Sequence, residues 1–160
     1  MTRQLALNKI WAKLLIVFLA LGAACIAVTN FGGASRVPAL VFLFGNLGAY
    51  VSAHRNLGEL KDEEIVGLSD SWLGLVVPSF VGGILAFILY MLFLSKIVGG
   101  DLFPNFVPDT GVTPVQSLDM LAAVHLEKPA EYAKLFFWSF LAGFNQKYAV
   151  DIIESVKAKA

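Results

Sequence analysis

The uncharged stretch at residues 72–95 limits the fold of this chain more than any other feature. It holds no acidic or basic side chain and is followed directly by Lys96. An α-helix needs about 20 apolar residues to cross the roughly 30 Å hydrocarbon layer of a bilayer. Soluble domains carry about 25% charged residues, whereas this chain carries 15% and has a mean hydropathy of +0.73. The sequence therefore predicts an integral membrane protein.

Further apolar stretches extend this prediction to an all-α membrane bundle of about four transmembrane helices, formed as one domain over residues 1–160. The predicted spans cover about residues 12–31, 37–54, 72–95 and 132–148. The last span has an uninterrupted apolar run only at 135–144, which is short for a crossing. It reaches membrane length if Lys134 and Lys147 extend their charged ends to opposite headgroup layers.

The connecting segments differ in character. The loop at 55–71 is acidic with interspersed apolar residues, which predicts a short amphipathic helix on the bilayer surface or under the bundle. The loop at 96–131 is rich in Gly, Pro, Asp and Asn. Within it, Thr113 and the residues after it have the pattern of a helix start, and we expect that short helix to end near Leu126. After residue 148, an amphipathic C-terminal extension is predicted.

The distribution of basic residues predicts the orientation. With a cytoplasmic N-terminus, the inside segments hold Arg3, Lys9, Lys13, Arg55, Lys61, Lys147, Lys157 and Lys159, and the outside segments hold Arg36, Lys96, Lys128 and Lys134. This excess obeys the positive-inside rule, so both termini are expected in the cytoplasm and the 96–131 loop outside. A cleaved signal sequence is the alternative for the first stretch, although signal apolar regions run only about 7 to 15 residues.

Pairs of small residues four positions apart recur in every predicted span. In lipid, such pairs let helix backbones approach closely, either within one chain or between copies. Asn46 is the strongly polar side chain near the centre of a span, where it either hydrogen-bonds across helices or lines a pore. The candidate packing or pore-lining residues are Asn46, Gly45, Gly48, Ser52, Ser79, Gly82, Gly83, Ser139 and Gly143.

The residue content argues against several classes of function. Ion-coupled transport normally needs a carboxylate, histidine or basic residue at mid-depth, and none of the predicted spans holds one there. His54 and His125 fall on opposite sides of the membrane in this topology, so they cannot share a metal ion. No nucleophile motif, phosphate loop or metal-ligand spacing occurs in the sequence. We therefore expect no enzyme activity, cofactor or metal, and the net charge of zero gives no support for nucleic-acid binding.

Three segments carry a resemblance to known proteins. They read "SWLGLVVPSFVGG" from Ser71, "GGDLFP" from Gly99 and "FLAGFNQKYAVDII" from Phe140. Together they resemble small bacterial multi-pass inner-membrane proteins without a known activity. In those proteins the last motif often reads Ala-Gly-Phe-Ser-Glu, and here Asn145 and Gln146 replace the final pair. The resemblance implies a bacterial inner (plasma) membrane location and a helical fold.

These observations lead to two expectations for function. The first is a non-enzymatic scaffold or accessory subunit in contact with membrane lipids. Its amphipathic cytoplasmic tail and acidic 55–71 loop would contact a partner, which is either another membrane protein or a further copy of the chain. The alternative is a homo-oligomeric channel or pore-forming effector, in which the small-residue faces pack between copies and Asn46 lines the lumen.

Overall fold

A computed structural model describes residues 3–33, 36–108 and 124–146. Over these residues the chain is all-α, with a two-stranded β-ladder as its only extended pairing. The elements are α1 (Arg3–Phe31), α2 (Arg36–Asn56), the 3-10 helix η2 (Leu57–Glu59), α3 (Asp62–Asp70), α4 (Leu73–Leu94), β1 (Val107–Pro108), β2 (Val124–His125) and α5 (Pro129–Phe144). Helices α1, α2 and α4 are long and apolar enough to cross a membrane. The prediction of an all-α fold with several long apolar helices is confirmed, and these helices are consistent with a multi-pass membrane protein.

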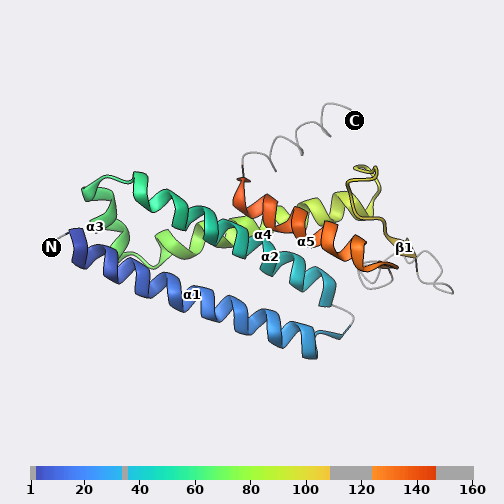
Figure 1. The fold of residues 1–160 in the computed structure, drawn as a ribbon, viewed down its shortest axis with the longest axis horizontal. Coiled ribbons are helices and arrows are strands. Elements are labelled where there is room, and N and C mark those ends of the chain that lie inside the picture. Colours follow the sequence, from blue (N-terminus) through green and yellow to red (C-terminus); the bar gives the residue numbers. More distant parts are fainter. Residues whose placement is uncertain (1–2, 34–35, 109–123, 147–160) are drawn as a thin grey trace.

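The long helices run back and forth along one axis of an elongated molecule (Figure 1). Helices α1 and α4 lead away from the end that holds α3, and α2 and α5 return towards it. We call this the α3 end, and the opposite end, with β1 and β2, the β end. Helices α2, α4 and α5 pack against one another, whereas α1 contacts mainly α2 and α3.

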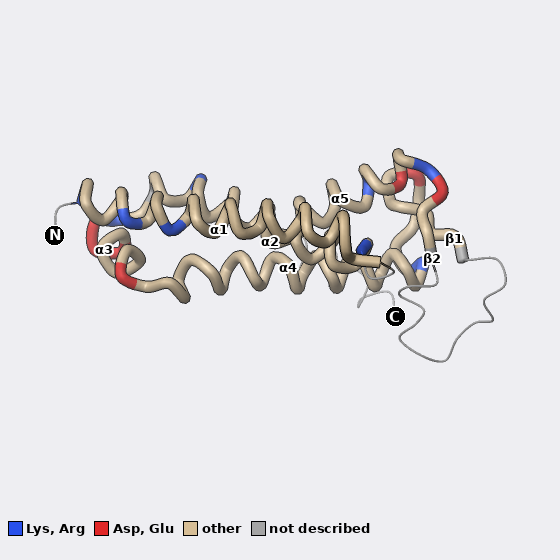
Figure 2. Tube along the Cα trace, turned by 90° about the horizontal axis from the view of Figure 1, so that it is seen from below, with Lys and Arg blue, Asp and Glu red and all other residues tan. Residues whose placement is uncertain are grey.

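Charged residues gather towards the two ends of the molecule (Figure 2). Between them lies a long middle section whose helices carry no Lys, Arg, Asp or Glu. Charged side chains are costly near the centre of a bilayer. This distribution therefore matches helices whose middle sections lie in hydrocarbon.

Helix α1 begins at Arg3, earlier than the predicted span at 12–31, because its first turns have a packing partner. The short amphipathic helix expected in the 55–71 loop is present as α3, which lies against these turns. Ile10 and Leu14 of α1 and Ile65 of α3 are buried in one apolar cluster. Three acidic residues in the first turn of α3 also favour its helical state through the helix dipole.

The loop after α4 is folded back on the helix ends. Lys96 (φ 55°) and Gly100 (φ 129°) turn the chain in the left-handed region, and β1 pairs antiparallel with β2. The prediction of a loop helix that ends near Leu126 is wrong at its C-terminal end, because Val124–His125 form the strand β2. The earlier residues of that predicted helix lie outside the described ranges. Proline disfavours a helical conformation in the residue before it, and Lys128, which precedes Pro129, is extended.

Helix α5 forms around the predicted fourth span but is short. Its 16 residues extend about 24 Å at 1.5 Å per residue, less than the roughly 30 Å of a hydrocarbon layer. Residues 147 and 148 of the predicted span, and the amphipathic C-terminal extension, lie outside the described ranges. The early end of α5 leaves space beside α2 and α4 at the α3 end.

Candidate functional site

Helices α2, α4 and α5 meet where each presents a glycine to the others. A Cβ atom added to Gly45 would lie 2.5 Å from the carbonyl oxygen of Gly82, and one on Gly82 would lie 3.0 Å from the Cα atom of Gly143. A Cβ atom on Gly143 would collide with the carbonyl oxygen of Gly45. Because the obstructing atoms belong to backbones, a larger residue requires whole helices to move apart.

Two more glycines extend this contact along α2 and α4. A Cβ atom on Gly48 would overlap the carbonyl oxygen of Phe140, and one on Gly83 would overlap the side-chain amide of Asn46. We refer to Gly45, Gly48, Gly82, Gly83 and Gly143 as the glycine contact. The structure thus brings these five predicted packing residues together within one chain.

The polar candidates lie beside the glycine contact. The Ser79 hydroxyl donates to the backbone carbonyl of Asn46 at 2.9 Å, and the Asn46 side chain donates to the carbonyl of Phe42 at 2.8 Å. Ser139 donates to the carbonyl of Leu135 at 2.7 Å. All three polar side chains are buried, and buried polar groups need such partners. In this chain Asn46 is enclosed between α2 and α4.

The small residues of α1 are placed differently. An added Cβ atom on Gly22 would meet no atom within 4 Å, and Ala20, Ala23 and Ala27 are exposed. We call residues 15–31 the exposed half of α1. Its exposed large apolar side chains are Leu15, Ile16, Phe18, Leu19, Ile26 and Phe31.

A cluster of aromatic side chains, not predicted from the sequence, fixes the loop at the β end. The indole N–H of Trp138 donates to the carbonyl of Leu102 at 2.9 Å. Its ring stacks on Phe103 with centroids 5.0 Å apart, while the Phe106 ring meets Tyr90 edge-on at 5.6 Å. Leu102 and Phe103 belong to the "GGDLFP" motif. These apolar residues within a polar loop were the sequence signal from which the cluster could have been predicted.

Glu131 joins the same loop to α5. Its carboxylate accepts the backbone N–H of Asn105 at 2.7 Å and pairs with the ammonium of Lys134 at 3.0 Å. The Asn105 hydrogen bond is the main reason that the pKa of Glu131 is lowered, and the Lys134 hydrogen bond adds to it. The ionised carboxylate therefore holds the loop against the start of α5.

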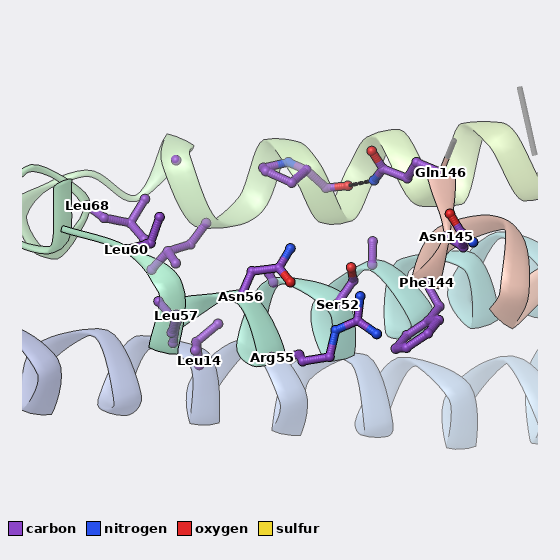
Figure 3. A pocket seen from close by; sticks show the side chains of 15 residues that line it. Leu14, Ser52, Arg55, Asn56, Leu57, Leu60, Leu68, Phe144, Asn145 and Gln146 are labelled. Atoms are coloured by element: carbon purple, nitrogen blue, oxygen red, sulfur yellow. Dashed lines mark hydrogen bonds between the residues drawn. The ribbon is translucent and has the colours of Figure 1, made fainter. Parts of the chain in front are cut away.

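A pocket of about 440 Å³ opens at the α3 end, where α5 stops and α2 and α4 continue. Figure 3 shows Arg55, Asn56 and Ser52 on the α2 side of it and Asn145 and Gln146 on the α5 side. Fifteen of the described residues line the pocket, and among them Arg55 carries the one charged side chain. We call it the Arg55 pocket.

Arg55 is held within this pocket by an aromatic ring. The centre of its guanidinium lies 4.7 Å from the ring centroid of Phe144. The side-chain amide of Gln146 donates to the carbonyl of Pro78 at 3.0 Å, which ties the end of α5 to α4. From the sequence, Arg55 was predicted only to follow the second span. The pocket around it could not be predicted, because it depends on where α5 ends. Ser52 also lies here, away from the glycine contact.

The described residues contain no group of three or more His, Cys, Asp or Glu side chains that could hold a metal ion. His54 lies at the α3 end with its ring 4.5 Å from that of Trp11. His125 belongs to β2 at the opposite end. The two histidines are therefore separated by the length of the bundle.

The fold and the glycine contact define an all-α protein with three candidate membrane-spanning helices, a tightly packed three-helix core and a loosely attached first helix. Comparison of the chain with models of protein families, with curated proteins and with solved structures found no match.

Proposed function

We propose that this chain is a non-enzymatic scaffold or accessory subunit of a bacterial inner membrane. In this proposal the fourth span begins within α5, after Glu131. Both termini lie in the cytoplasm, and the β end faces outward. The excess of basic residues in the segments assigned to the cytoplasm supports this orientation. Reporter fusions after Lys61 and after Asp109 test it, and reporters on the same side would overturn the span count.

The exposed half of α1 carries the proposal. The 18-residue apolar window of α1 is only 6% buried inside the chain, compared with 39% for α4. Its small residues Ala20, Ala23 and Ala27 are exposed, and such residues allow another helix to approach closely in lipid. The partner is therefore a transmembrane helix of another membrane protein, which binds along this half.

Site-specific photo-crosslinking in cells tests this surface. A benzoylphenylalanine at position 23, replacing Ala23, is expected to give one discrete protein adduct. The matched control is the same probe at position 80, replacing Phe80, which is 52% exposed on α4 and is expected to label only lipid. Equal labelling at both positions, or lipid labelling alone at position 23, would contradict the scaffold.

The alternative function, a homo-oligomeric pore lined by Asn46, draws no support from the position of that side chain. Asn46 is 6% exposed and is bonded within the chain. The oligomeric mass in mild detergent and ion leakage from proteoliposomes separate the two functions. A monomer or small complex without leakage is expected; a ring-like oligomer whose conductance changes on Asn46→Leu would replace the scaffold with the pore.

A further inference from the structure

The Arg55 pocket combines one permanent positive charge with neutral polar groups and an apolar wall. Its fifteen lining residues include no carboxylate. Among the described residues, the ion pairs involve Arg3, Lys9 and Lys134 as cations but not Arg55. Within the described ranges the pocket is therefore positively charged, and none of its fifteen lining residues neutralises that charge.

The contact with Phe144 leaves Arg55 prepared for an anion. A guanidinium stacks through its face and donates hydrogen bonds through its edge, in a fork that matches two oxygens of a phosphate. Arg55 is placed over the Phe144 ring and takes part in none of the ion pairs of the described residues, so its N–H donors can bind a ligand. Asn56 and Ser52, which line the pocket beside it (Figure 3), offer neutral hydrogen-bonding groups to the same ligand.

The depth of the pocket points to a lipid source for the anion. Arg55 belongs to the last turn of α2, and Gly74 and Leu75 on the opposite wall belong to the first turn of α4. These turns are the ends of two candidate membrane spans. Leu14 and Phe144 also line the pocket, so its apolar wall borders the hydrocarbon level, where lipid chains begin.

Two other basic side chains at this end, Lys9 and Lys13, are already engaged. Lys9 pairs with Asp70 at 3.5 Å, and Lys13 donates to the carbonyl of Ser69 at 2.7 Å. Both lysines serve to attach α3 to α1. Arg55 is thus distinguished from them by facing a cavity, and the cavity volume of about 440 Å³ lies within the roughly 300 to 1,000 Å³ range of small-molecule sites.

We infer that the Arg55 pocket binds the phosphodiester headgroup of an anionic phospholipid from the leaflet at the α3 end. The guanidinium edge of Arg55 binds the phosphate oxygens, and Asn56 and Ser52 bind the polar remainder of the headgroup. The acyl chains leave the pocket beside Leu14 and Phe144. This inference concerns a lipid ligand and stands independently of the scaffold role of α1.

Lipid titration of the full-length, delipidated protein by native mass spectrometry tests the inference. With dioleoylphosphatidylglycerol, we expect one tightly retained lipid and an affinity about tenfold lower in Arg55→Gln, because a charge-assisted bidentate contact is lost. Arg36→Gln is the matched control, since Arg36 lies at the opposite end of the same helix. Unchanged binding in Arg55→Gln, or an equal loss in Arg36→Gln, would overturn the site.

Two further variants keep the test informative if Arg55→Gln folds poorly. Arg55→Lys keeps the charge but loses the fork, so a smaller reduction in affinity is expected. Asn56→Leu changes an exposed residue of the pocket and is expected to weaken binding about threefold through one lost hydrogen bond. Wild-type affinity in both variants would overturn the inference.

Three additional experiments distinguish a phospholipid from a lipid without phosphate, from free phosphate and from the chain's own carboxylates. Dioleoylglycerol, which lacks the phosphate, is expected not to be retained, and inorganic phosphate at equal concentration is expected not to displace the lipid. The opposite result in either arm overturns the phospholipid assignment. The full-length variant Asp151→Asn/Glu154→Gln is expected to bind lipid as the wild type does. Lipid binding only in that variant would overturn the inference, because it would show that the carboxylates of Asp151 and Glu154 compete with the lipid for the pocket.

Discussion

Helices α2, α4 and α5 differ from α1 in what holds them in place. The three core helices meet through glycine backbones, so that a Cβ atom on Gly143 has no room. Helix α1 is held mainly through its first turns, where Ala6, Ile10 and Leu14 are buried. Beyond Leu14 it contacts the chain loosely, and a Cβ atom on Gly22 meets nothing.

The difference shows how packing in lipid depends on backbone distance. Water does not drive apolar helices together inside a bilayer, so close backbone approach and hydrogen bonds decide which helices associate. The core helices satisfy this requirement with one another. The exposed half of α1 carries small residues as well, but Ala20, Ala23 and Ala27 stay exposed, which is why we assign this half to a partner.

The largest effect is expected when a bulky residue replaces one glycine in the core and, for comparison, one glycine in the exposed half of α1. Gly143→Leu is expected to destabilise the protein by more than about 3 kcal/mol, because overpacking here pushes backbones apart. Gly22→Leu in α1 is expected to change stability by less than about 0.5 kcal/mol. Thermal unfolding of the two variants in the same detergent measures the difference, and equal melting temperatures would refute the packing contrast.

A neighbouring pair in α1 locates the point where its attachment ends. Leu14 is 2% exposed and Leu15 is 56% exposed. Leu14→Ala is expected to cost about 2 kcal/mol through a cavity between α1 and α3, whereas Leu15→Ala stays near zero. Limited proteolysis between α3 and α4 and thermal melts are the measurements. Similar losses in both variants would mean that α1 is held along its whole length.

Removing a polar contact inside the core has a smaller expected effect. Ser79→Ala removes the hydroxyl that joins α4 to Asn46 of α2. Interhelical hydrogen bonds in membranes contribute on average about 0.6 kcal/mol, and we expect a loss of that size. Thr29→Ala in α1, whose hydroxyl bonds within its own helix, serves as the control. A loss above that of Gly143→Leu would mean that polar contacts, not backbone packing, dominate the core.

The smallest expected effect is a pH dependence at the β end of the core. Because the pKa of Glu131 is lowered in the folded protein, its stabilising contribution is present above the ordinary value of 4.5 and is lost as the pH falls through the lowered pKa. Glu131→Gln is expected to remove this part of the acid sensitivity. Melting curves from pH 7 to pH 3 measure it, and an unchanged pH profile in the variant would exclude the role of Glu131.

The lengths of the helices followed closely from the sequence where charge marks their ends. Lys96 closes the long stretch of α4, and Arg55 lies in the last turn of α2. The extended strand at Val124–His125 was not predicted, because a local helix-start pattern at Thr113 carries no information about pairing with Val107–Pro108. Pairing between segments distant in the sequence depends on the turn geometry that brings them together.

Small-residue spacing indicated that backbones come close, but not which helices meet. The same pattern occurs in α1 and in α2, and the structure places only the latter in the three-helix contact. Likewise, the Arg55 pocket arises from the level at which α5 ends beside α2 and α4.

The sequence by itself determined the all-α class and the positions of the long helices that could span a membrane, since both depend on local hydrophobicity and on charge at helix ends. Tertiary structure alone decided that Gly45, Gly82 and Gly143 share one contact, that the outer half of α1 is left uncovered, and that Arg55 faces a cavity. These features depend on the relative heights and distances of helices, which are set by contacts between residues far apart in the chain.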